Sequence, residues 1–189
     1  MVITERKHVK ELFLFTHRLY RSETPNDVSE AALDTITRAL GCSRTSILLF
    51  DDAGIMRFAV WRGLSDAHRR IVEGHSPWTR DVKDPQPVCI QDIEATDLPE
   101  SLKETVRAEQ IGVLAFIPLV AKGTLIGEFM TYYDTRYVFS DAEVALAVTI
   151  ARQLGFSLER RSTEKALREI QRLLDSTVGH RGTEEGALP

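Results

Sequence analysis

Residues Ile111 to Tyr133 read IGVLAFIPLVAKGTLIGEFMTYY, and this stretch decides the fold class of the chain. Two apolar runs, rich in Val, Ile, Phe and Tyr, flank the short segment Ala121–Thr124, which contains a glycine. This pattern predicts a β-hairpin. The first arm, Val113 to Val120, is apolar at almost every position, whereas a strand with one solvated face alternates apolar and polar residues. We therefore expect the hairpin at the centre of a sheet that is covered on both faces.

Two amphipathic helices are predicted at the N-terminal end. The second begins with Thr24-Pro25-Asn26-Asp27, in which Thr suits the N-cap, Pro the first helical position and Asp the third. Gly41 is expected to end it. The first has apolar residues at i, i+3, i+4 and i+7 spacing, which predicts a single buried stripe formed by Val9, Leu12, Phe13, Thr16, Leu19 and Tyr20.

A second hairpin and a long connection separate these helices from the central hairpin. Strands over Arg44–Phe50 and Ile55–Trp61 flank a short turn, as in a β-hairpin. The following connection, Leu64–Pro87, has about 24 residues and is longer than compact domains generally use without a function. Val88–Ile90 predicts a short strand, and Pro99–Glu109 predicts a helix.

A long helix is predicted after the central hairpin. Ser140 and Glu143 form a capping box at its start, and apolar positions continue at helical spacing for about 35 residues, far beyond the mean helix length. Its last part has nothing left in the chain to pack on. We therefore expect Leu167, Ile170 and Leu174 to contact a second copy of the same helix in a homodimer. The segment 178–189 is expected to be a mobile tail.

Composition and charge limit the possible classes of function. The chain has 189 residues, enough to form a core without disulfides or metals. Its formal net charge of −4 argues against a general nucleic-acid binder, which would carry a basic face. We find no run long enough for a transmembrane helix and no signal peptide. With only two cysteines, Cys42 and Cys89, these features predict a reducing, cytoplasmic location without membrane contact.

Several short motifs, in order, resemble those of the GAF domain family. They are Pro118-Leu119 at the end of one central strand, Leu125-Ile126-Gly127 in the next strand, and Phe139-Ser140-Asp141-Ala142-Glu143 at the start of the last helix. The earlier run PVCIQDI, Pro87 to Ile93, resembles the strand and Asp before the family's pocket helix. The resemblance covers residues 10 to 160. It implies an α+β fold with a central antiparallel sheet, N- and C-terminal helices forming a dimer bundle on one face, and a pocket covered by loop and helix on the other.

The resemblance also implies a regulatory sensor module of a signal-transduction protein. Such a module binds a small molecule and relays the signal through its terminal helices to an output such as a histidine kinase. We expect a sensor domain over residues 1–160, then a helical linker over 161–189 that is coiled-coil-like to about residue 177. The chain shows no kinase, cyclase or helix-turn-helix signature of its own, so it looks like an excised or free-standing sensor. The alternative is a dimerisation and relay scaffold that binds no ligand.

Seven residues are candidates for the pocket. Glu128 and Tyr132 share one face of a central strand, and Glu128 either lines a polar pocket or pairs with a cation inside the fold. Phe116 is a candidate, although large apolar residues more often belong to the core. Aromatic rings beside a His and an Arg can hold a planar or anionic ligand, which adds Trp61, His75, Trp78 and Arg80. In the simpler interpretation, the Trp residues pin the loop to the sheet while His75 and Arg80 are solvated.

Other chemistry has little support in the sequence. No nucleophile–base pair, phosphate loop or metal cluster is visible, so we expect no enzymatic activity. Cys89 is expected to be buried and inert, and neither cysteine has the neighbouring His of bilin-binding GAF domains or belongs to the cysteine set of GAF-type methionine sulfoxide reductases. Ala121-Lys122 matches the motif of the cyclic-nucleotide-binding members only in part. The histidines do not have the paired spacing of a metal site, but a single histidine is enough for an axial haem ligand. The sequence therefore assigns no cofactor.

Overall fold

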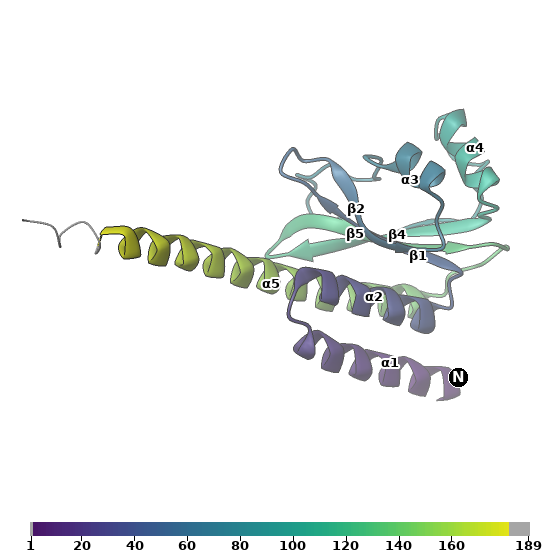
Figure 1. Ribbon diagram of the computed structural model, residues 1–189. Helices are drawn as coiled ribbons and strands as arrows, with labels where there is room; N and C mark the ends of the chain where they lie inside the picture. The colour runs from purple at the N-terminus through teal and green to yellow at the C-terminus, as the bar shows by residue number, and fades with distance from the viewer. Residues whose placement is uncertain (1, 182–189) are drawn as a thin grey trace, which may run out of the picture.

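A five-stranded antiparallel sheet with helices on both faces forms the centre of the computed structural model (Figure 1). The structure describes residues 2–181, and the side chains of residues 6–176. The strand order is β2-β1-β5-β4-β3, which places the hairpin quoted above inside the sheet, as predicted. The strands are β1 (Arg44–Phe50), β2 (Met56–Arg62), β3 (Val88–Ile90), β4 (Val113–Ala121) and β5 (Thr124–Tyr133).

The helices divide between the two faces of the sheet. Helices α1 (Val2–Arg21), α2 (Pro25–Leu40) and α5 (Asp141–Arg181) lie on one side, and α3 (Asp66–Val72) and α4 (Glu100–Ala108) lie on the other (Figure 1). Helices α2 and α5 pack on the sheet, whereas α1 packs on α2 and α5. This arrangement confirms the predicted α+β fold class.

The central hairpin and the helix starts follow the local chemistry of the sequence. The turn residues Lys122 and Gly123 have φ angles of 50° and 76°, and a two-residue hairpin with positive φ at both positions favours glycine. At the start of α2, the Thr24 hydroxyl accepts a hydrogen bond from the Asp27 N–H at 3.1 Å, and the Asp27 carboxylate accepts one from the Thr24 N–H at 2.9 Å. The predicted capping box is therefore present.

Strand alternation gives the two faces of the sheet different surroundings. Ile117 and Phe129, paired in register, are buried in the core on the α2/α5 side. Their neighbours Phe116 and Met130, also paired, belong to a separate apolar cluster beneath α3 and α4. Both arms of the hairpin are thus covered on both faces, as their apolar sequence predicts.

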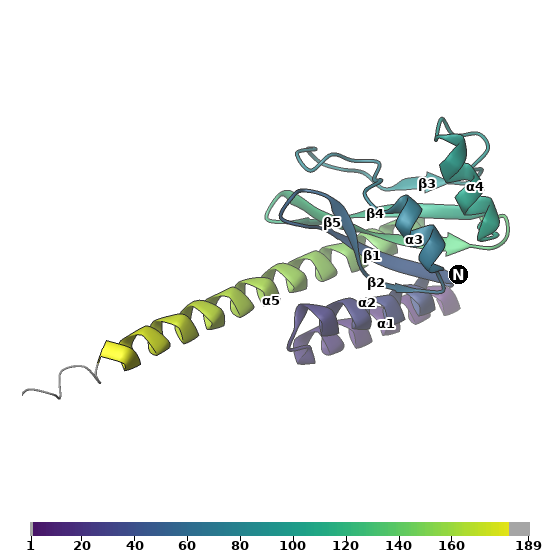
Figure 2. The ribbon, with the colours of Figure 1, turned by 45° about the horizontal axis from the view of Figure 1, so that its top comes forward.

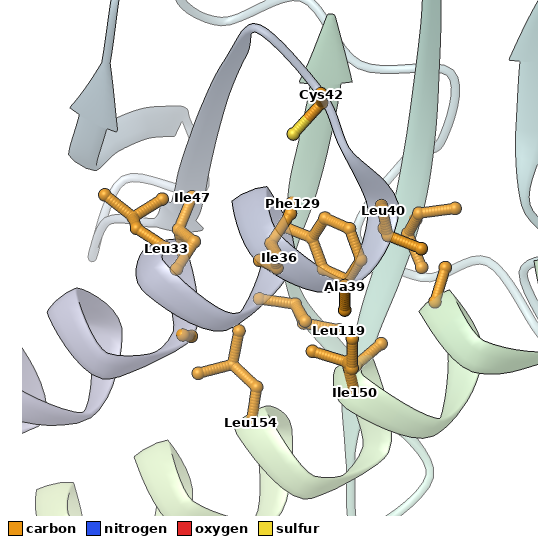
Figure 3. Close-up of a cluster of buried hydrophobic side chains, with 14 of the residues drawn as sticks. Leu33, Ile36, Ala39, Leu40, Cys42, Ile47, Leu119, Phe129, Ile150 and Leu154 are labelled. Carbon is orange, nitrogen blue, oxygen red and sulfur yellow. The ribbon is translucent and has the colours of Figure 1, made fainter. Parts of the chain in front are cut away.

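The larger core joins α2 and α5 to the sheet. Leu33 and Ile36 of α2 meet Ile150 and Leu154 of α5 over the strands (Figure 3). Cys42 lies in the same cluster and is buried. At this interface α5 approaches β4 very closely, because a Cβ atom on Gly155 would lie 2.8 Å from the Val120 carbonyl oxygen. Only a residue without a side chain fits there unless the backbone moves.

The buried face of α1 differs from the predicted stripe. Phe15 and Leu19 are buried, whereas Val9, Phe13 and Tyr20 are 68%, 71% and 78% exposed. Thr16 is exposed as well, so the prediction that these four residues are buried is wrong. Apolar residues occupy two faces of this helix, and spacing alone does not show which face α2 and α5 cover.

Helix α5 continues well past the sheet (Figure 2). Leu167, Ile170 and Leu174 lie in this projecting part, with 61%, 55% and 61% of their surface exposed. Their role in a dimer stays a prediction, as does the domain boundary at residue 160, and the predicted mobile tail lies for the most part outside the described residues. Across residues 2–181, the helices lack the combination of length and hydropathy required to cross a membrane.

Candidate functional site

A cavity of about 610 Å³ lies between the sheet and the α3/α4 layer. This volume falls in the range typical of small-molecule sites. The floor is formed by side chains of β1, β4 and β5 that point away from the main core, namely Leu48, Leu114, Phe116, Met130 and Tyr132. Helices α3 and α4, strand β3 and the two loops that connect them form the rest of the wall, including Val72, His75, Ser76, Val88, Ile90, Ile93, Leu98, Leu102 and Val106.

The cavity wall is mainly apolar and carries no basic side chain other than histidine. No Lys or Arg occurs among its residues, all of which lie in the described part of the chain. Its ionisable residues besides Tyr132 are His68, His75 and Asp97. His75 and Asp97 are exposed to water, whereas His68 is buried. The wall therefore suits a ligand with a large apolar surface and few polar groups.

His68 is the buried polar side chain of this wall. Ser65 caps the N-terminus of α3, and its hydroxyl accepts a hydrogen bond from the His68 N–H at 3.1 Å. Leu64, His68 and Val72 follow at four-residue spacing, which turns His68 inward, and its ring meets Tyr132 edge-on at 5.9 Å. Only 2% of His68 is exposed, and neither ring nitrogen has a partner of good hydrogen-bond geometry among the described residues, although the Thr105 backbone lies near the ring. Burial lowers the pKa of His68, and the Glu109 carboxylate and the Thr105 backbone only partly oppose this, so the neutral imidazole predominates at pH 7.

Glu128 is a second buried polar group on the same side of the sheet. Its Oε2 accepts a hydrogen bond of 2.6 Å from the Ser76 hydroxyl, and Ser76 lines the cavity. The other oxygen, Oε1, has no partner among the described residues, and Glu128 forms no salt bridge there. Burial raises the pKa of Glu128 to about 7, and the Ser76 hydrogen bond only partly opposes this shift. Within the described part of the chain, Glu128 therefore pairs with no cation and is not among the residues that line the cavity.

Tyr132 contributes its ring rather than its hydroxyl to the site. The hydroxyl lies 3.1 Å from the Ser46 hydroxyl and 3.1 Å from the Met130 sulfur. Burial raises its pKa far above the usual value. Because the hydroxyl already has partners beneath the cavity floor, His68 remains the buried polar side chain available to a ligand.

The structure brings together three of the seven candidate residues. His75, Phe116 and Tyr132 line the cavity, whereas Trp61, Trp78, Arg80 and Glu128 are not among its wall residues. Trp61 lies on β2 with the Arg69 guanidinium stacked 3.6 Å from its ring centroid. The Arg80 guanidinium is 5.7 Å from the Phe50 ring.

The chain's thiols and acidic groups do not add to the site. Neither Cys42 nor Cys89 lines the cavity, and burial raises the pKa of both, to about 12 for Cys42. The thiolate form is therefore scarce at neutral pH. No group of three or more His, Cys, Asp or Glu residues that could hold a metal ion is found within the described residues.

Comparisons with known proteins agree with this architecture. A family model for the GAF domain matches residues 22–159, and the chain therefore belongs to the GAF domain family. GAF domains are regulatory sensor modules. A search of proteins with curated functions finds no match.

Two solved structures illustrate the relationship. One is a domain described as part of a two-component sensor histidine kinase from Sinorhizobium meliloti 1021, which is 49% identical over 78% of this chain and 99% of that chain, with a TM-score of 0.73. The other is the GAF domain of a phosphoenolpyruvate-protein phosphotransferase from Coxiella burnetii, which is 17% identical over 85% and 98% of the two chains, with a TM-score of 0.68. The second likeness shows the fold alone. The first makes this chain a sensory GAF domain related to those of sensor histidine kinases.

Proposed function

We propose that this GAF domain is a sensor that binds a small molecule in the cavity above the sheet and relays the signal through α5. The cavity itself is the observation that carries this proposal, because its volume of about 610 Å³ greatly exceeds the few voids of water size that close-packed interiors contain. A collapsed, ligand-free scaffold would pack its loop against the sheet. We further propose that the domain has no catalytic activity, since the Ser76 hydroxyl of the cavity wall is hydrogen-bonded to Glu128 and no Ser–His or Cys–His hydrogen bond is found among the described residues of that wall.

The sheet offers a short route from the cavity to the terminal helices. Phe116 and Met130 are cross-strand partners on the cavity face, and the next pair along the hairpin, Ile117 and Phe129, packs in the core that holds α5. A ligand that displaces Phe116 and Met130 therefore also shifts the neighbouring pair in the core. It changes the output only through a difference in affinity between two arrangements of the helices.

We propose that the output is a histidine kinase or a similar domain and that the sensor acts in the cytoplasm as a homodimer. The exposed stripe of Leu167, Ile170 and Leu174 supports the homodimer, because an apolar stripe at near-heptad spacing is typical of a coiled-coil partner. The sensor histidine kinase context of the Sinorhizobium domain supports the choice of output.

Ligand binding can be tested on the purified protein. Native mass spectrometry with an absorption spectrum detects a ligand that is retained during purification, and a thermal-shift screen of small molecules detects weaker ones. The matched pair of variants is Val72→Phe, which places a larger side chain in the cavity wall, and Val138→Phe, which makes the same change at an exposed position outside it. We expect ligands to raise the Tm of the wild type and of Val138→Phe but not of Val72→Phe.

The outcomes separate the sensor from the scaffold. Extra mass or a Tm shift that Val72→Phe abolishes supports the sensor. A protein that carries no extra mass, and whose Tm responds to no compound or responds equally in both variants, would favour the dimerisation and relay scaffold.

A further inference from the structure

The cavity contains one unusual polar feature, which no apolar ligand would explain. His68 is 2% exposed, lines a mainly apolar wall, and has no partner of good hydrogen-bond geometry for either ring nitrogen among the described residues. Buried polar groups in native proteins almost always have a hydrogen-bond partner. An unpartnered one indicates that the partner is a molecule outside the chain.

The protonation state of His68 limits what that partner is. A neutral imidazole has one N–H donor and one nitrogen acceptor, so it pairs best with a group that both donates and accepts. A hydroxyl group meets this requirement. The ring of Tyr132 meets the imidazole edge-on at 5.9 Å. The Thr105 backbone lies close enough to the imidazole to influence it, so it can accept from the N–H, and the other ring nitrogen then accepts from a ligand hydroxyl.

The charge of the wall excludes anionic ligands. Phosphates and carboxylates in proteins are generally held by Arg, Lys or arrays of backbone N–H groups. The wall contains no Arg or Lys to pair with an anion. The guanidinium of Arg44, which lies near enough to influence His68, is paired with Asp134.

We propose that His68 is the polar anchor of the cavity and that the ligand is an uncharged, mainly apolar molecule carrying a hydroxyl group. This inference rests on the proposed sensor function and gives its ligand a chemical class. The apolar body of the ligand lies on Phe116, Met130 and Tyr132, and its hydroxyl pairs with the imidazole.

Three test ligands that share one ring system separate the effect of the hydroxyl group on affinity from the effects of the apolar body and of charge. 1-Naphthol has the hydroxyl, naphthalene lacks it, and 1-naphthyl phosphate carries a charged group in its place. Each is titrated into the wild type, into His68→Leu, and into the control His17→Leu, which makes the same substitution at an exposed position of α1 outside the cavity wall. We expect 1-naphthol to bind the wild type and His17→Leu about three- to tenfold more tightly than naphthalene, which corresponds to the usual free energy of one hydrogen bond. The phosphate should bind least, and His68→Leu should bind 1-naphthol and naphthalene equally.

NMR spectroscopy of the wild type tests the same contact without a substitution, so the proposal can still be tested if His68→Leu does not fold. The imidazole ¹⁵N resonances of His68 should shift when 1-naphthol is added and stay close to their original positions with naphthalene. Equal binding of 1-naphthol and naphthalene, or tightest binding of the phosphate, would overturn the His68 assignment while leaving the sensor function intact. Failure of all three ligands to bind, together with no effect of Val72→Phe in the screen above, would overturn both.

Discussion

The Ser76 hydroxyl donates a 2.6 Å hydrogen bond to the buried carboxylate of Glu128, 52 residues further along the chain. This bond joins the loop after α3 to the central strand β5. Through this bond, the cavity wall at Ser76 is attached to the sheet at the Glu128 carboxyl group. The carboxylate has one oxygen without a partner among the described residues, so its charged form is poorly stabilised.

The first prediction concerns pH. Because the pKa of Glu128 is raised to about 7 in the folded protein, the folded state binds more protons than the unfolded state between about pH 4.5 and 7. The contribution of Glu128 to stability is therefore favourable at low pH and is lost as the pH rises through 7. We expect this group alone to make the protein about 2–3 kcal/mol less stable at pH 8 than at pH 5.

Urea unfolding at several pH values measures this contribution. Other carboxylates with lowered pKa values, such as Asp27 and Asp34, change stability in the opposite direction, so the comparison is between the wild type and Glu128→Gln. The difference between the two unfolding free energies should change with pH across this interval. If the unfolding free energies of the two proteins change in parallel with pH, Glu128 does not titrate between pH 5 and pH 8.

The second prediction concerns Ser76, which donates the hydrogen bond to Glu128. Ser76→Ala leaves the buried carboxylate without a hydrogen bond, which should cost about 1–3 kcal/mol and raise the pKa of Glu128 further. Amide hydrogen exchange should increase in residues 74–78. Ser101→Ala, at an exposed position on α4, is the control. In the Glu128→Gln background the loss should be smaller, and an equal loss in both backgrounds would mean that the two side chains are not coupled.

The third prediction concerns the contact between α5 and β4. Alanine normally stabilises a helix relative to glycine by about 1 kcal/mol. At position 155 the added Cβ meets the Val120 carbonyl oxygen at 2.8 Å, so we expect Gly155→Ala to destabilise the protein by a net of about 1–2 kcal/mol. Denaturant unfolding compares it with Ser162→Ala, at an exposed position of the same helix, which should have little effect. A more stable Gly155→Ala would show that the helix moves away at no cost.

The fourth prediction concerns the dimer. Ile170→Asp combined with Leu174→Asp places two charges on the exposed apolar stripe of α5 and should convert a dimer to a monomer, measured by light scattering. Lys165→Glu changes the net charge by the same amount on the opposite side of the helix and should leave the dimer intact. A double variant that keeps the dimeric mass would place the main interface elsewhere.

Local patterns predicted most of the fold. The apolar run of Val113–Val120, the Lys122-Gly123 turn and the caps at Thr24 and Ser140 act over a few residues, and the structure confirms each of them. The buried face of α1 was not predictable in this way, since it depends on which of two apolar faces the neighbouring helices cover.

The site was harder to predict because it is built from long-range packing. Trp61 and Arg80 look like pocket residues in the sequence, yet the paths of β2 and of the loop place them outside the cavity wall. His68 was overlooked, although its spacing from Leu64 and Val72 indicates an inward position on a short helix. Its importance depends on the packing of α3 beside α4 over the sheet, which no local pattern shows.

The close approach at Gly155 has a mechanical consequence. Helix α5 is continuous over 41 residues; it is held against the domain from Gly155 through Leu158 to Arg161, and residues 165–176 are exposed and project beyond the sheet. The helix therefore works as a lever that pivots near Arg161, where its last contacts with the rest of the domain lie. At a rise of 1.5 Å per residue, a tilt of about 5° there moves the end at Arg181 by about 3 Å. A displacement too small to disturb the packing under the cavity is thus amplified before it reaches whatever follows the helix.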